Sequence, residues 1–280
     1  MHISRRTRRP RSRGPSSPAP EAARVTVHPV ARYVPLLIAG DEQGLRDLFR
    51  GPPRVNDPHL GWVDESRFDQ FVENSHQGLR ERSATVEHIT TTATGGGATE
   101  ECVLHLVRSG GAVSLPVAIA SDTSPDARLE SIRIYHSMWP LIGLHFVRAP
   151  VLPVLAAAAL PDVVRRYHDC LARGDLAGIV EQFAPAGGLR EPGGVLNVHR
   201  GASELRRFFT LLLSNGGGVG VELCAVADEG ASCALEYVVT MWGRSILPCQ
   251  AAAAVYERAD TGLLAEVRLY DDIERPFHVH

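Results

Sequence analysis

The sequence contains no lysine, and all 29 of its basic residues are arginines. Without lysine there is no Schiff-base nucleophile, no Ser-Lys dyad and no phosphate loop ending in Gly-Lys-Ser or Gly-Lys-Thr. The pattern Gly-x-Gly-x-x-Gly is missing as well, so no nucleotide cofactor is indicated. These absences exclude the common lysine-dependent and dinucleotide-dependent enzymes.

Metal-binding patterns are equally scarce. The chain has no His-Glu-x-x-His motif, and its closest histidine spacing is the terminal pair His278 and His280. Its five cysteines include no Cys-x-x-Cys pair, which favours reduced thiols and a cytoplasmic location. The longest apolar run, residues 151–160, contains a proline and is shorter than the about 20 residues that a membrane helix needs. We therefore expect no metal, no cofactor and no membrane partner.

Charge is concentrated at the start of the chain. Residues 1–24 hold seven arginines and one glutamate, a net charge of +6, which leaves −9 for the remainder. Residues 1–28 are rich in Arg, Pro and Ser without apolar periodicity, and this predicts a disordered basic tail. A basic arm can contact nucleic acid. Because the acidic remainder offers no second basic patch, we expect no nucleic-acid partner.

An internal repeat dominates the rest of the chain. The stretch RYVPLLIAGDEQGLRDLFRGPPRVNDP, residues 32–58, aligns without a gap with RYHDCLARGDLAGIVEQFAPAGGLREP, residues 166–192. The matched positions lie 134 residues apart: Tyr33 with Tyr167, Gly40-Asp41 with Gly174-Asp175, Phe49 with Phe183, Asp57 with Glu191, and Pro58 with Pro192. A constant offset through so many positions indicates a duplicated unit.

The repeat continues through three later segments. Residues 84–89 match 219–224, which pairs Glu87 with Glu222; residues 101–107 match 232–239, which pairs His105 with Glu236; and residues 129–137 match 264–272. Apolar spacing predicts helices at the start of each unit and Val/Ile/Tyr-rich strands separated by glycine-rich turns after them. Helices followed by an antiparallel sheet are typical of the α+β class.

The composition also suggests where the units divide. The proline-punctuated, alanine-rich stretch after the first unit predicts a linker at residues 147–160. We accordingly predict a first domain at 29–146 and a second at 161–277.

The run RY…GD…LF…DP, with a terminal IRIYHS or VRLYDD, resembles the nuclear transport factor 2-like superfamily, and more closely its SnoaL-like and ketosteroid isomerase-like branches. The resemblance covers nearly all of residues 29–277 as two tandem copies. It implies two cone-shaped α+β barrels, each with three helices on a curved antiparallel sheet around an apolar pocket. It also implies that the two domains pair through their sheets within the chain.

The same resemblance implies roles for particular residues. The general base of an acid-Pro motif falls on Asp57 and Glu191, and the oxyanion-stabilising tyrosine on Tyr33 and Tyr167. The protonated acid of steroid isomerases has no counterpart near Ala118 or Ala253. The chain instead offers Glu87 and Glu222, an acid layout similar to that of tandem polyether epoxide hydrolase/cyclase proteins, in which one carboxylate is base and the other acid.

Each candidate also has a plain structural interpretation. An acid before proline can simply form a turn, the tyrosines can be core residues, and Glu87 and Glu222 can point to solvent if their valine neighbours face the helices. His105, Glu236 and Trp242 can line a pocket or lie between the units. We expect a protein that binds a small apolar, oxygenated molecule, and a cofactor-free isomerase, cyclase or epoxide hydrolase; the alternative is a non-catalytic binding or scaffolding protein.

Overall fold

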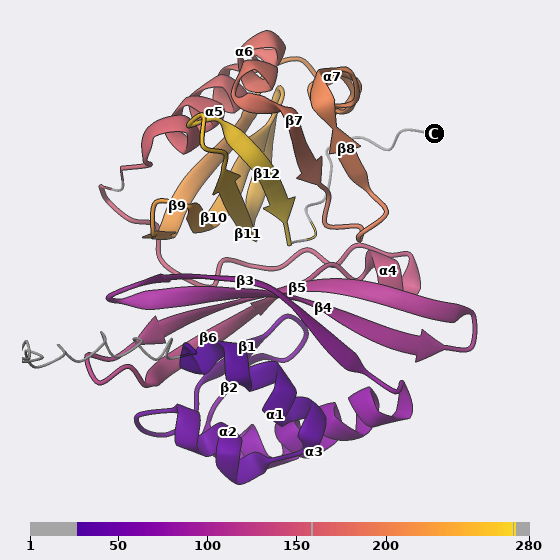
Figure 1. Cartoon of the computed structure of the whole chain (residues 1–280), viewed down its shortest axis with the longest axis vertical. Helices are drawn as coiled ribbons and strands as arrows, with labels where there is room; N and C mark the ends of the chain where they lie inside the picture. The colour runs from indigo at the N-terminus through magenta and orange to yellow at the C-terminus, as the bar shows by residue number, and fades with distance from the viewer. Residues whose placement is uncertain (1–26, 158, 271, 273–280) are drawn as a thin grey trace, which may run out of the picture.

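The computed structural model describes residues 27–157, 159–270 and 272, arranged as two units of the same design. In Figure 1 the two sheets lie in the middle of the molecule, with the helices of residues 33–81 below them and those of residues 162–212 above. The predicted basic tail falls almost wholly outside the described residues, as do His278 and His280. Among the residues that are described, no helix is long and apolar enough to cross a membrane.

Both units begin with helices and end with a meander of strands. The first consists of η1 (Pro29–Arg32), α1 (Tyr33–Ala39), α2 (Glu42–Leu48), β1 (Val55–Asp57), β2 (Gly61–Val63), α3 (Glu65–Glu81), β3 (Thr85–Thr94), β4 (Gly97–Arg108), β5 (Gly111–Thr123) and β6 (Leu129–Tyr135), followed by the short α4 (Trp139–Ile142). The second consists of α5 (Asp162–Arg173), α6 (Leu176–Glu181), β7 (Phe183–Arg190), β8 (Val198–Arg200), α7 (Gly201–Leu212), β9 (Val219–Asp228), β10 (Ser232–Trp242), β11 (Ser245–Arg258) and β12 (Leu264–Leu269). The predicted α+β class is confirmed, whereas the domain limits 29–146 and 161–277 stay a prediction.

The repeated Gly-Asp pair separates the first two helices of each unit. Gly40 has φ 70° and Gly174 has φ 69°, a left-handed conformation that favours glycine. The next residue, Asp41 or Asp175, caps the following helix by accepting a hydrogen bond from the amide three residues ahead, at 2.8 Å and 2.9 Å respectively. The motif therefore fixes the angle at which the chain turns back over the sheet.

Each sheet has six strands in the same order, β2-β1-β6-β5-β4-β3 and β8-β7-β12-β11-β10-β9. The edge strands of a sheet do not pair with each other in the described part of the chain, so neither sheet closes into the predicted barrel. The sheets are also mixed, because β1 pairs with β6, and β7 with β12, in parallel. That parallel pairing places the end of β1 or β7, and thus the acid-Pro motif, beside the end of the last strand.

One face of each sheet packs on its helices, and the other face packs on the partner sheet. The helix-covered faces hold two separate apolar cores, which include Phe68 and Ile119 in the first unit and Phe209 and Tyr256 in the second. Between the sheets lies a third cluster of mostly small residues: Ala118, Ala120, Tyr135, Ala234, Ala251, Ala253, Val255 and Tyr270. Small side chains let the two sheets approach closely, so the predicted pairing within the chain is present.

Two reciprocal ion pairs cross this interface. Arg133 of β6 donates through Nε to Glu236 of β10 at 2.6 Å, and Arg268 of β12 donates through Nη2 to Glu101 of β4 at 2.7 Å. All four side chains are buried. In each case a tyrosine two residues after the arginine also donates its hydroxyl to the same glutamate. The arrangement is that of a pseudo-twofold interface, in which each unit presents the same patch to the other.

The interface corrects one part of the sequence alignment. Glu101 lies opposite Ala118 in its sheet, and Glu236 lies opposite Ala253 in the other. Glu236 is therefore the counterpart of Glu101, and the predicted equivalence of His105 and Glu236 is wrong. The sequence alignment matched Cys102 of β4 with Cys233 of β10, which differs by four residues from the register in the structure. Irregular strand pairing and loop-length differences hide the true offset from the sequence.

Candidate functional site

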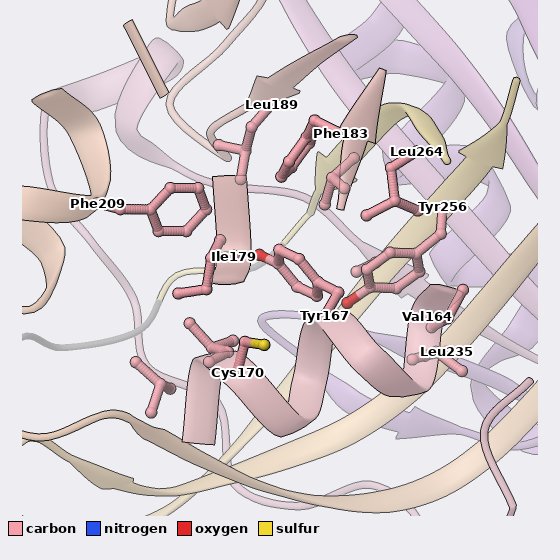
Figure 2. Close-up of a cluster of buried hydrophobic side chains, with 14 of the residues drawn as sticks. Val164, Tyr167, Cys170, Ile179, Phe183, Leu189, Phe209, Leu235, Tyr256 and Leu264 are labelled. Atoms are coloured by element: carbon pink, nitrogen blue, oxygen red, sulfur yellow. The ribbon is translucent and has the colours of Figure 1, made fainter. Parts of the chain in front are cut away.

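The second unit encloses a cavity of about 970 Å³ between its helices and the concave face of its sheet. Figure 2 shows part of its wall, where Tyr167, Tyr256, Phe209 and Leu189 converge. Most of the lining is apolar or aromatic, and it includes Leu171, Phe208, Leu212, Val219, Val221, Tyr237, Val239, Trp242 and Leu269. Among the described residues that line the cavity there is one carboxylate, Glu191, and no arginine. Because its lining is mostly apolar, the cavity is suited to an apolar ligand.

Glu191 follows β7 directly and lines the cavity together with Pro192. Its backbone amide donates to the carbonyl of Asn197 at 2.9 Å, which fixes the acid-Pro turn. Its Oε1 lies 2.7 Å from Nε2 of His199, a residue of β8. The His199 ring stacks on Phe208, with ring centres 4.6 Å apart. The carboxylate is thus half-buried and held in place by the His199 imidazole.

Tyr167 lies on α5 with its side chain surrounded by other rings. The ring centres of Phe183, Phe209 and Tyr256 lie 5.8 to 6.3 Å from its own, with edge-to-face geometry. Burial raises the pKa of the Tyr167 hydroxyl, so the phenol stays protonated. A protonated phenol at the cavity wall can donate a hydrogen bond.

His168, the next residue of α5, also lines the cavity. Its Nε2 lies 2.7 Å from the hydroxyl of Tyr256, and its Nδ1 has no hydrogen-bond partner among the described residues. Burial lowers the pKa of His168 to about 4, so the ring is neutral near pH 7. The sequence did not single out His168, Tyr256 or His199; the placement of a histidine directly after the matched tyrosine was the available signal.

Part of the cavity wall comes from the chain between the units. Trp139 of α4 and residues 143–147 line the cavity. Trp139 stacks on His145, with ring centres 4.8 Å apart and planes 16° apart. This segment has no counterpart among the residues that the repeat matched, and it spans the predicted boundary between the first domain and the linker.

The corresponding residues of the first unit are arranged differently. Tyr33 is fully buried (0% exposed), and its hydroxyl has no hydrogen-bond partner in the described part of the chain. Burial, and then the charge of Asp57, raise the pKa of Tyr33. Asp57 accepts hydrogen bonds from the amides of His59 at 2.8 Å and Leu60 at 3.0 Å, as in an Asx turn. Here the acid-Pro motif has a clear structural role.

Glu87 and Glu222 point away from the helix-covered faces. Val86 packs against the core of the first unit and Val221 lines the cavity of the second, and side chains alternate along a strand. Glu87 has 61% of its side chain exposed and lies 3.0 Å from Nε2 of His105. Glu222 is exposed as well. Moreover, three strands separate β3 from β1. Neither glutamate is therefore placed to act with Asp57 or Glu191.

The three remaining candidates are scattered. Trp242 lines the cavity, and its Nε1–H donates to the carbonyl of Leu212 at 2.8 Å. Glu236 lies in the interface between the units, and His105 lies on the surface with Glu87. Within the described residues, no group of three His, Cys, Asp or Glu side chains is arranged to hold a metal ion.

Comparison with known protein families finds one match, which lies within the second unit. Residues 164–267 match the family of SnoaL-like domains, as the resemblance predicted. No curated protein matches the chain in sequence.

Three solved structures are each similar to a part of this chain. A protein assigned as a polyketide cyclase from Sinorhizobium meliloti is 21% identical, with a TM-score of 0.34, over 39% of this chain and 94% of that one. An NTF2-like protein of unknown function from Cytophaga hutchinsonii is 14% identical, with a TM-score of 0.33, over 42% and 95%. An uncharacterised cystatin-fold protein from Novosphingobium aromaticivorans is 13% identical, with a TM-score of 0.33, over 40% and 98%.

Proposed function

Because residues 164–267 form a SnoaL-like domain, we propose that the second unit binds a small apolar, oxygenated molecule and acts as a cofactor-free isomerase, cyclase or epoxide hydrolase. One observation carries the proposal. Glu191 is the one carboxylate among the described residues that line the large apolar cavity, and it is paired with His199 at 2.7 Å. An acid in such a setting is suited to proton transfer.

In this proposal Glu191 is the general base. In an isomerisation it removes a proton from carbon beside a carbonyl group and returns it to another carbon of the substrate. In epoxide hydrolysis it removes a proton from water while the water oxygen bonds to an epoxide carbon and the ring carbon–oxygen bond breaks, and the proton then passes to the released oxygen. His199 holds the carboxylate through Oε1 and moderates its charge as the proton arrives. The apolar lining excludes water, which strengthens the electrostatic contribution of the few polar groups present.

The developing negative charge on the substrate oxygen needs a neutral donor. Tyr167 is such a donor, since burial keeps its hydroxyl protonated. His168 and Tyr256 add a second neutral polar pair on the same wall. With no arginine among the described lining residues, the site favours a neutral ligand over an anionic one.

For the first unit we propose a supporting role, and for the whole chain a cytoplasmic location. The amides of His59 and Leu60 already occupy Oδ1 of Asp57, and Tyr33 is enclosed by its core. These two features also favour the alternative function for that unit, namely a non-catalytic binding or scaffolding domain.

Two variants test the catalytic proposal. Turnover of candidate epoxides and enones, chosen from the small molecules that co-purify with the protein and are identified by mass spectrometry, is expected to fall by roughly 10² to 10⁴ in Glu191→Gln. Glu222→Gln is the matched control, because that glutamate is exposed in the same unit, and it should leave turnover unchanged.

The outcome separates the two functions. Loss of turnover in Glu191→Gln with retained ligand binding supports acid/base catalysis. If the wild-type protein binds the co-purified molecule and converts no substrate, or if Glu191→Gln turns over as fast as wild type, the catalytic proposal fails and the non-catalytic alternative stands.

A further inference from the structure

The chain between the two units is fastened at both ends to one carboxylate of the second unit. Asp272 accepts hydrogen bonds from Ser137 Oγ at 2.5 Å and Met138 N at 2.9 Å, at the start of the segment. It also accepts from His145 Nδ1 at 2.8 Å and Phe146 N at 3.0 Å, at its end. Residues 137–147, here named the cap, therefore form a loop that is closed on Asp272.

The middle of the cap lies against the cavity. Trp139 and residues 143–147 line it, and Trp139 approaches Gly193, which follows the acid-Pro motif. A Cβ placed on Gly193 would lie 3.5 Å from the Trp139 ring, and one on Gly194 would lie 3.5 Å from Pro140. The cap consequently covers the end of the cavity at which Glu191 sits.

The carboxylate that holds the cap is buried and charged. Its side chain is 1% exposed. Burial alone would raise the pKa of Asp272, but the hydrogen bonds from His145, Ser137 and the two amides outweigh that effect and hold its pKa below the usual value. A buried carboxylate that accepts four hydrogen bonds holds the cap strongly and in one geometry, because hydrogen bonds to charged acceptors are stronger than those between neutral groups.

We propose that the cap is a wall of the ligand-binding site and that Asp272 is the positioning residue that holds this wall closed over a bound ligand. The inference rests on the proposed function only in requiring that the cavity binds a ligand. It assigns to the second unit's site a set of residues that come from outside that unit. Asp272 touches no ligand itself and acts through the cap.

The test uses the full chain and the neutral fluorescent probe N-phenyl-1-naphthylamine, whose emission rises in an apolar cavity. Asp272→Ala removes the acceptor of all four hydrogen bonds, and the probe is expected to dissociate from it about tenfold faster or more. Asp260→Ala, an exposed aspartate of the same unit, is the matched control and should release the probe at the wild-type rate.

A second variant guards against misfolding of Asp272→Ala. Leu144 lines the cavity from the cap and is 59% exposed, so Leu144→Ser leaves the fold and the Asp272 contacts in place. Its dissociation constant for the probe is expected to rise several-fold while its urea midpoint is unchanged. Hydrogen exchange supplies a readout that a purely structural role does not move. Probe binding should slow exchange of the Met138 and Phe146 amides in wild type, and should not do so in Asp272→Ala.

The outcomes distinguish this inference from the proposed function. Equal probe release from wild type, Asp272→Ala and Leu144→Ser, with no change in amide exchange on binding, overturns the role of the cap while leaving the cavity as a binding site. If the probe does not bind wild type at all, both the proposed function and the inference are overturned.

Discussion

Ser137 and Asp272 occupy the same position in the two repeats, and in the folded chain they hydrogen-bond to each other at 2.5 Å. Ser137 lies two residues after the end of β6, and Asp272 lies three residues after the end of β12. The contact shows that the ends of both sheets meet close to the pseudo-twofold axis of the molecule. From this point the cap extends from the first unit over the cavity of the second. The cap has no counterpart in the matched residues of the repeat, so the pseudo-twofold symmetry of the interface does not extend to the candidate site.

The interface ion pairs are expected to be the most sensitive polar contacts in the molecule. Glu236→Gln leaves Arg133 buried with a weakened partner, and Glu101→Gln does the same to Arg268. Breaking a buried pair by removing one charge typically costs about 3–5 kcal/mol. Because Arg133 keeps Asp122 and Arg268 keeps Glu257 as second partners, we expect losses of up to that size in both variants, measured as the free energy of unfolding in urea. Glu87→Gln, at an exposed position, is the control and should change it little; an equally mild effect at Glu236 would contradict the prediction.

Tyr33→Phe should make the protein more stable. The hydroxyl of Tyr33 is buried without a partner in the described part of the chain, so its removal relieves a desolvation cost at no loss of a hydrogen bond. The expected gain is about 1 kcal/mol in the free energy of unfolding. Turnover should not change, in contrast to Tyr167→Phe, for which the proposal expects a lower kcat. A less stable Tyr33→Phe variant would indicate that the hydroxyl has a partner after all.

His168 should make stability depend on pH in a defined window. Its pKa is about 4 in the folded chain against 6.5 for an unperturbed histidine, because burial disfavours the charged ring. Between these values the unfolded chain binds the extra proton, so stability is lost as the pH falls from about 6.5 towards 4 and levels off below. From pH 7 to pH 4.5 the loss is about 2 kcal/mol.

The measurement for His168 is urea unfolding at these two pH values. His168→Gln should be less sensitive to the change than wild type, by about the stated 2 kcal/mol. The comparison of the two proteins removes the contribution of the other titrating groups. An identical pH dependence in wild type and variant would contradict a buried, neutral His168.

Thiol reactivity should report on the packing directly. Four of the five cysteines are buried and Cys249 is exposed. Burial raises the pKa of Cys102 and of Cys233 to about 12, which suppresses their reactive thiolates. A chromogenic disulfide reagent should therefore modify one thiol per folded chain rapidly and all five only in urea. Cys249→Ser should abolish the rapid phase, and its persistence in that variant would show that another cysteine is accessible.

The features that the sequence could predict are local or repeated. The Gly-Asp pairs and acid-Pro turns depend on neighbouring residues and recur at a fixed offset, so they indicated the helices, the duplication and the class of fold. The match of residues 164–267 to SnoaL-like domains agrees with that reading. Because Val86 and Glu87 alternate along a strand, the sequence allowed Glu87 to lie either on the helix-covered face of the sheet or on the opposite face. The packing of Val86 against the core of the first unit decides for the opposite face.

Other features depend on contacts between distant segments, which a single sequence does not display. The registers of β4 and β10 follow from irregular pairing that no residue pattern marks, so Glu236 was aligned with His105 instead of Glu101. The pairing of Glu191 with His199 joins β7 to β8 across a turn, and the cap reaches the cavity through Asp272, more than a hundred residues away. The volume of the cavity in the second unit follows from the sum of many side-chain volumes.

The covalent link between the two units has an evolutionary consequence. In a symmetric homodimer every substitution is made twice, so a change that closes one cavity closes both. Here the halves are encoded separately, and each substitution falls on one side of the pseudo-twofold axis only. The half that carries Tyr33 could therefore enclose that tyrosine in its core and extend the cap across its neighbour, while the half that carries Tyr167 kept the cavity that this tyrosine lines.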